Sequence, residues 1–191
     1  MKDLYDDYRR VFLLIAGLVL GAGYIAAVHA EEEIWLLVDT RARMIKVKSG
    51  NDTRAEFSNI SIGQNGAGYD KVQGDYKTPL GIYRIGWTNS DSRFYKFYGI
   101  TYPSRIDAKR GLDKGLIDRA TYRSLVDADL LDQVPSQYTL LGGQIGIHGL
   151  GSADQEVHKV ANWTRGCIAI TNSQIDSLGF WVRKGMFVVI R

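Results

Sequence analysis

Apolar and polar residues alternate over two short runs in the first third of the chain. Residues 34–40 read IWLLVDT and residues 44–49 read MIKVKS, and only RAR separates them. A period of two, rich in β-branched and aromatic side chains, is typical of strands that bury one face. We therefore predict a β-hairpin here, and a further strand in FSNISIG, residues 57–63.

A glycine-rich stretch follows, and strand patterns return after it. Residues 63–81 contain five glycines and one proline, which predicts a long loop. Loops of this length in a compact domain are usually functional or mobile. Strands are predicted afterwards in GIYRIGW (81–87), FYKFYGITY (94–102), GGQIGIHG (142–149), GCIAI (166–170) and MFVVI (186–190).

Two segments have the spacing of helices instead. Residues 104–131 carry apolar side chains at helical intervals without a β-branched cluster, which predicts two short helices broken near Gly115. Thr171 with Gln174 resembles a capping box that opens a helix through IDSLGFWV. The elements together predict an α+β class, with a mainly β core and an inserted two-helix segment.

The N-terminal region has a different character. Residues 11–28 contain no charge and directly follow two arginines. This run is intermediate between a signal-peptide core and a transmembrane helix, and VHA at residues 28–30, ahead of Glu31, resembles a cleavage site. The arginines predict that the following chain is exported. We therefore expect residues 1–30 to be a signal peptide or an inner-membrane anchor, and residues 31–191 to be one periplasmic or cell-envelope domain.

Charge does not identify a polyanionic partner. The chain has 24 Lys and Arg and 21 Asp and Glu, a formal net charge of +3, and no basic run. Nucleic-acid-binding proteins usually concentrate positive charge on one face or helix. We therefore expect no nucleic-acid partner.

Cys167 is the only cysteine of the sequence. It cannot form an intramolecular disulfide, and a lone thiol in an oxidising compartment is a liability unless it is buried or used. In GCIAI and in GGQIGIHG, two isoleucines share one strand face, while Cys167 or His148 lies on the other beside small residues. If these strands are neighbours, the imidazole can accept the thiol proton and stabilise an ion pair. Gly149 and Gly151 suggest that His148 lies at a solvent-reaching rim.

Two other interpretations are open. Free cysteines are often small buried hydrophobes, although the position of Cys167 opposite the isoleucines favours a nucleophile. His148, His158 and Cys167 would offer metal ligands, but their spacing matches no compact zinc pattern and a fourth ligand is missing. We predict neither a metal site nor a cofactor.

These residues resemble the signature of the L,D-transpeptidases with a YkuD-type catalytic domain. His148-Gly149 followed by the sequence TRGC at 164–167 is similar to the family's His, spacer and Ser/Thr-x-Gly-Cys. GDYKTPLGIYRI, residues 74–85, is similar to its Gly-Asp-x-x-Thr-Pro-x-Gly-x-Tyr segment, and KGMFVVI resembles its closing strand. The similarity covers residues 33 to 191.

The sequence departs from many members at two places. They carry His two residues before the cysteine and Arg two residues after it, where this chain has Arg165 and Ala169. GCIAIT is closer to a branch with a Gly-Cys-x-Ala-x-Thr motif, which includes members thought to hydrolyse or to use other acceptors.

The resemblance implies a cysteine-dependent L,D-transpeptidase that acts on peptidoglycan stem peptides through a thioester in cell-wall remodelling. It implies Cys167 as the nucleophile and His148 as the proton acceptor and donor. The Gly149 carbonyl would fix the imidazole tautomer, and Gly166 would support an oxyanion bound by the Cys167 N–H.

Several roles stay open. Asn162, Thr164 and Arg165 are candidates for substrate binding, with loop stabilisation as the alternative. The acceptor is a second stem peptide, a protein lysine or another amine, or water, which would make the chain an L,D-carboxypeptidase or amidase. A non-catalytic wall-binding module is a further alternative. The insert at 104–131 either covers the cleft or is peripheral.

Overall fold

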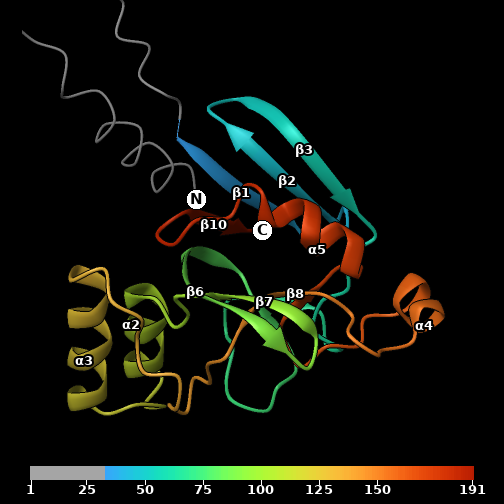
Figure 1. Ribbon diagram of the computed structural model, residues 1–191. Helices are drawn as coiled ribbons and strands as arrows, with labels where there is room; N and C mark the ends of the chain where they lie inside the picture. The colour runs from blue at the N-terminus through green and yellow to red at the C-terminus, as the bar shows by residue number, and fades with distance from the viewer. Residues whose placement is uncertain (1–32) are drawn as a thin grey trace, which may run out of the picture. The chain divides into compact units, whose positions relative to one another are not determined.

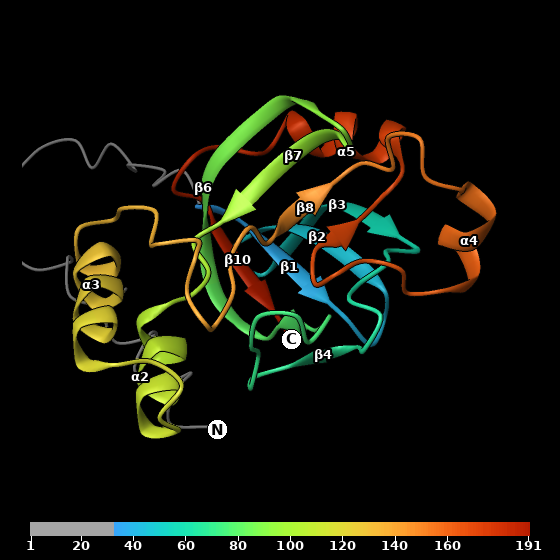
Figure 2. The ribbon, with the colours of Figure 1, turned by 90° about the horizontal axis from the view of Figure 1, so that it is seen from below.

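The computed structural model describes residues 33–191, and Figures 1 and 2 show their arrangement. One eight-stranded sheet has the order β3-β2-β1-β10-β6-β7-β8-β9, and β4 and β5 form a separate pair. The strands are β1 (Ile34–Asp39), β2 (Met44–Ser49), β3 (Asp52–Ser58), β4 (Ala67–Gly68), β5 (Thr78–Pro79), β6 (Gly81–Ser92), β7 (Tyr95–Ile100), β8 (Gly146–His148), β9 (Ile168–Ala169) and β10 (Phe187–Ile190). The helices are α2 (Arg105–Asp113), α3 (Arg119–Leu130), α4 (Gln155–Val160) and α5 (Asn172–Gly179).

The predicted hairpin is confirmed. β1 and β2 pair antiparallel, with Leu36 opposite Val47 and Val38 opposite Ile45. All four of these side chains are fully buried, because the period of two sends them to the same face of the pleated sheet.

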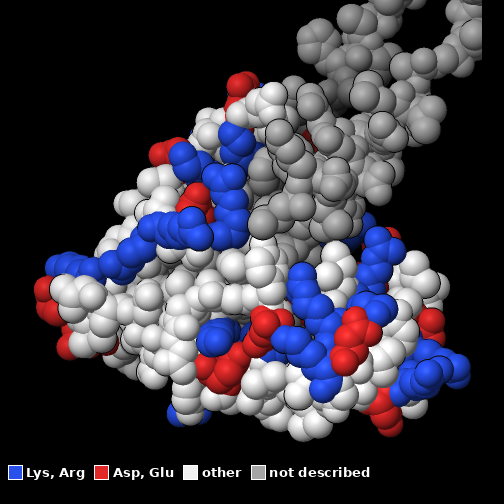
Figure 3. All heavy atoms as spheres, turned by 180° about the vertical axis from the view of Figure 1, so that it is seen from behind, with Lys and Arg blue, Asp and Glu red and all other residues white. Residues whose placement is uncertain are grey.

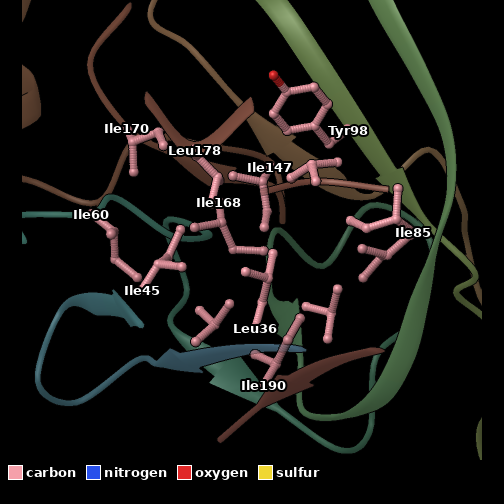
Figure 4. Close-up of a cluster of buried hydrophobic side chains, with 14 of the residues drawn as sticks. Leu36, Ile45, Ile60, Ile85, Tyr98, Ile147, Ile168, Ile170, Leu178 and Ile190 are labelled. Atoms are coloured by element: carbon pink, nitrogen blue, oxygen red, sulfur yellow. The ribbon is translucent and has the colours of Figure 1, made fainter. Parts of the chain in front are cut away.

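The long strand β6 joins two halves of the sheet. Its first residues pair with β10 and its later residues with β7, and the register shifts between Ile85 and Trp87. A shift of this kind bends a strand and increases its twist. Figure 4 shows the result, with Leu36 and Ile190 on one side of the core and Ile147 and Ile168 on the other. The core also receives α5, because Ile175 and Leu178 are fully buried.

The inserted helix pair is confirmed at α2 and α3. Ser104 and Asp107 form a capping box at the start of α2, and Gly115, with a φ of 68°, turns the chain between the helices. The pair has its own small apolar cluster, which consists of Ala108, Ile117, Leu125 and Leu141. Figures 1 and 2 both place α2 and α3 at the opposite end of the domain from α4.

Some elements differ from the prediction. β8 has three residues and β9 has two, far fewer than expected, because the chain takes positive φ angles at Gly142, Gln144 and Gly166. The strand predicted at 57–63 is wrong in position: β3 spans Asp52–Ser58, and the residues beyond it make only isolated bridges. Helix α4 was not predicted.

The predicted signal or anchor segment, residues 1–30 with its apolar run at 11–28, lies outside the described residues. Within residues 33–191, none of the helices has the length and apolar character needed to cross a membrane.

Charged side chains of both signs are mixed on the surface. On the face in Figure 3, Lys and Arg lie beside Asp and Glu. Ion pairs such as Lys46–Glu56, 2.8 Å, and Lys114–Asp70, 2.7 Å, neutralise part of the positive charge locally. This distribution agrees with the mixed charge pattern of the sequence.

Candidate active site

Strands β8 and β9 are parallel neighbours, as the sequence suggested. Ile147 lies opposite Ile168 and His148 opposite Ala169. Both isoleucines are fully buried in the core. Because side chains alternate along a strand, His148 and Cys167, one residue before β9, face away from that core on the same side.

His148 is not at a solvent-reaching rim. Only 1% of the residue is exposed, because aromatic side chains from distant segments cover the imidazole. Phe94, in the β6–β7 turn, stacks on it at a centroid distance of 4.3 Å, and Trp163 presents its ring at 5.9 Å with an interplanar angle of 68°. Phe97, its neighbour on β7, lies at 6.2 Å. Single-strand reasoning had no means to identify these partners.

The imidazole has a defined tautomer. Its Nδ1 lies 2.6 Å from the carbonyl oxygen of Gly149. A carbonyl oxygen only accepts, so Nδ1 carries the hydrogen and Nε2 keeps its lone pair. Gly149 has no space for a side chain, since a Cβ there would lie 2.7 Å from Asn172 Oδ1 and 2.9 Å from the Phe94 carbonyl oxygen.

Burial keeps the imidazole uncharged. Desolvation lowers the pKa of His148 to about 4, although the hydrogen bond to Gly149 acts in the opposite direction. The charge of Arg93 lowers this pKa further. At neutral pH, His148 is therefore a proton acceptor.

The thiol is also uncharged at rest. Burial raises the pKa of Cys167 to about 11, against the opposing effects of the Gly146 backbone and of the Lys71 and Arg93 charges. Although part of the residue reaches the surface, protein atoms surround the sulfur closely enough to desolvate it, and Sγ donates to the carbonyl oxygen of Gln144 at 3.5 Å. No hydrogen bond joins Sγ to the imidazole in the described part of the chain. The two pKa values do not favour a preformed ion pair, so the thiol proton must leave as attack begins.

The loop before Cys167 is held from two sides. Thr164 is buried; its Oγ1 donates to the Cys167 carbonyl oxygen at 2.6 Å and accepts from the Gly166 N–H at 3.1 Å. Thr78 Oγ1 donates to the Gly166 carbonyl oxygen at 2.9 Å. Gly166 itself has a φ of 126°, and a Cβ there would lie 2.7 Å from the Lys77 carbonyl oxygen. This backbone requires glycine.

The three residues predicted to bind substrate, Asn162, Thr164 and Arg165, have different surroundings. Thr164 stabilises the loop, and Asn162 does the same by accepting from the Ile62 N–H at 3.2 Å. Arg165 is exposed, with its guanidinium 5.8 Å from the centre of the Tyr76 ring. The Gly166 N–H is already bonded to Thr164, whereas the Cys167 N–H has no acceptor among the residues described.

Sequence reasoning missed a largely buried ion pair beside the nucleophile loop. Lys71, 6% exposed, donates from Nζ to Asp75 Oδ1 at 2.8 Å. Asp75 also accepts from the Val72 and Lys77 N–H groups, both at 2.9 Å. The Lys71 Nζ lies 3.4 Å from where a Cβ on Gly166 would stand. Asp75 and Thr78 belonged to a recognised segment, but nothing in the sequence marked Lys71.

Removing the Lys71 charge should make the thiol less acidic. That ammonium lowers the pKa of Cys167, so Lys71→Met is expected to raise this pKa and slow alkylation by iodoacetamide at a given pH. The variant should still fold, since Asp75 keeps both backbone donors. Alkylation rates across a pH series measure the effect. Lys109→Met, at an exposed ion pair on α2, is the matched control, and equal profiles for the two variants would contradict the assignment.

His158 does not join His148 and Cys167 as a metal ligand. Its Nδ1 accepts from the Trp163 Nε1–H at 3.3 Å. Within residues 33–191, no group of three or more His, Cys, Asp or Glu side chains is placed to hold a metal ion.

Comparison with protein families gives a match over almost all of the described chain. Residues 33–190 match the family described as the L,D-transpeptidase catalytic domain, YkuD. Among curated proteins, no sequence match was found.

Solved structures share the fold. The helical cell shape determining protein Pgp2 from Campylobacter jejuni is 22% identical with a TM-score of 0.58, and the match covers 85% of this chain and 48% of that one. Bd1075 from Bdellovibrio bacteriovorus is 18% identical with a TM-score of 0.50, over 86% of this chain and 50% of that one. The chain thus matches about half the length of each of these structures.

Proposed function

Because this chain belongs to the L,D-transpeptidase family with a YkuD catalytic domain, we propose that it is a cysteine-dependent transpeptidase acting on peptidoglycan stem peptides. The observation that carries the proposal is the placement of His148 and Cys167. They face the same side of two paired strands, with the imidazole neutral and its Nε2 free to accept. A nucleophile, a base beside it and a group that orients the base are the parts that covalent catalysis needs.

In the first step, Cys167 Sγ attacks the carbonyl carbon of the third residue of a stem tetrapeptide, a meso-diaminopimelate. The thiol proton passes to His148 Nε2 as the C–S bond forms. The bond to the terminal D-Ala then breaks, and the imidazolium returns the proton to the departing amine. The product is a thioester on Cys167.

In the second step, an amine attacks the thioester. His148 takes a proton from the amine as the new amide bond forms. The C–S bond then breaks, and the imidazolium returns the proton to the leaving sulfur, which regenerates the thiol. The acceptor is a second stem peptide or another amine, such as a protein lysine. Water in the same position would release a free carboxylate and make the protein a carboxypeptidase or amidase.

The oxyanion of each tetrahedral intermediate needs a donor that is not already engaged. The Cys167 N–H meets this requirement within the described residues, and we assign it that role. Gly166 contributes through the backbone shape that presents this N–H, since its own N–H is bonded to Thr164. The exposed Arg165 is the candidate for binding a substrate carboxylate, by a bidentate contact.

The cellular setting is part of the proposal. Peptidoglycan lies outside the inner membrane, so we propose that residues 1–30 export or anchor the chain and that residues 31–191 act in the periplasm or cell envelope. A structural relative determines helical cell shape in Campylobacter jejuni. We propose an analogous contribution to cell-wall remodelling and cell shape here.

Product analysis tests the reaction. The full-length protein, incubated with purified tetrapeptide muropeptides, should give cross-linked dimers and free D-Ala by mass spectrometry. Trimmed monomers alone would overturn transfer in favour of hydrolysis. The absence of both products and of an acyl-enzyme would overturn catalysis and favour a wall-binding module. Cys167→Ala is the control for background reactions.

A further inference from the structure

His158 is a second buried histidine near the site, and the proposed reaction does not use it. It lies in α4 and is only 1% exposed. Its Nε2 makes no hydrogen bond of ordinary geometry among the described residues, although the Asn59 backbone still raises the pKa of the ring.

The other ring nitrogen of His158 has a specific task. Its Nδ1 accepts from the Trp163 Nε1–H at 3.3 Å. An indole N–H only donates, so this contact requires the neutral form of His158 with a lone pair on Nδ1. Burial first, and the charge of Arg43 second, lower the pKa of His158 and favour that form, against the opposing effect of the Asn59 backbone.

Trp163 connects this histidine to the catalytic pair. Its ring lies 5.9 Å from the His148 ring, edge to face. It also lies 6.3 Å from the ring of Phe94, which itself stacks on His148. It also directly precedes Thr164, which braces the Cys167 carbonyl. A displacement of Trp163 would therefore reach both the base and the nucleophile loop.

We propose that His158 is a positioning residue that holds Trp163 against His148. Helix α4 thereby controls the exclusion of water from the His148 imidazole and the orientation of this ring. With the indole in place, water is kept from the imidazole and His148 stays neutral. If the indole is released, water enters and the pKa of His148 rises towards its ordinary value. The expected effect on turnover rests on the proposed function, but the effect on His148 does not.

Three substitutions distinguish the loss of the His158–Trp163 hydrogen bond from a change in side-chain volume. His158→Leu removes the hydrogen-bond acceptor and fills a similar volume with an apolar side chain. His158→Asn puts an amide oxygen near the place of Nδ1 and should restore the contact. Trp163→Phe keeps an aromatic ring but removes the donor, and it tests the same link if His158→Leu does not fold. Lys159→Met, at an exposed neighbour on α4, is the matched control.

Two measurements need no substrate. By NMR, His158→Leu should move the Trp163 indole N–H resonance and raise the pKa of His148 by about one unit or more. Trp163→Phe should raise the same pKa, whereas His158→Asn and Lys159→Met should leave it near the wild-type value. An unchanged His148 titration in folded His158→Leu and Trp163→Phe would overturn the proposal, even if the protein proves to have another activity.

The third measurement is turnover of muropeptides. His158→Leu should lower kcat about tenfold with little change in KM, because misplacement of a base slows chemistry more than binding. His158→Asn should recover most of the loss. A change confined to KM, or no recovery in His158→Asn, would contradict a positioning role.

Discussion

Cys167→Ala is expected to abolish turnover of muropeptides, with a residual rate at least about a thousandfold below wild type. The proposed reaction stores the acyl group on Sγ, and alanine offers no atom that can carry it. Product formation and the mass of the protein after incubation with substrate measure the two consequences. Wild type should gain the mass of an acyl group, and the variant should not.

The loss should come from chemistry rather than from unfolding. Thr164 holds Cys167 through its backbone carbonyl, and Thr78 holds the adjacent Gly166 in the same way. Substitution of the thiol leaves both contacts intact. Cys167→Ser, which is nearly isosteric, should therefore melt close to the wild-type temperature and still lose activity. Full turnover in either variant would refute covalent catalysis by this residue.

His148→Gln is expected to lower kcat by about 10²–10⁴-fold, the usual contribution of a general base. Glutamine cannot take up a proton, although it fills much of the same space. The wild-type pH dependence should carry the same information. Because burial lowers the pKa of His148 to about 4, kcat/KM should fall only as the pH drops through about 4, where the imidazole becomes protonated. An unperturbed histidine would produce this fall near pH 6.5.

The alkaline side of the profile gives a separate check. Burial raises the pKa of Cys167 to about 11, so kcat/KM should stay flat between about pH 4 and about pH 11. In His148→Gln the acid limb should disappear. A limb near pH 6.5, or one that survives in the variant, would remove His148 as the base.

Elements defined by neighbours in sequence were predictable. The β1–β2 hairpin follows from an alternation that local reading detects, and the capping boxes at Ser104 and Thr171 need only a partner three residues away. The adjacency of β8 and β9 was a condition of the predicted site, suggested by their matching isoleucine pairs, and the structure meets it. The family resemblance is confirmed over nearly the whole described domain.

Features set by distant segments were not predictable. The burial of His148 depends on Phe94 and Trp163, which belong to a hairpin turn and to the nucleophile loop. Lys71 looked like an ordinary loop lysine, because its position beside Gly166 arises only when residues almost a hundred positions apart meet. The truncated strands β8 and β9 have a similar cause: the flanking backbone turns to meet other loops instead of continuing the sheet.

The long-range hydrogen bonds that hold the nucleophile loop have a consequence for biosynthesis. Thr78 reaches Gly166 across 88 residues of chain, and Asn162 reaches Ile62 across 100. Contacts between such remote positions close slowly and late, because the entropy of the intervening chain must first be lost. A nascent or half-folded polypeptide therefore contains the sulfur without the surroundings that tune it. Chemical reactivity at this single thiol should act as a reporter of the finished tertiary structure.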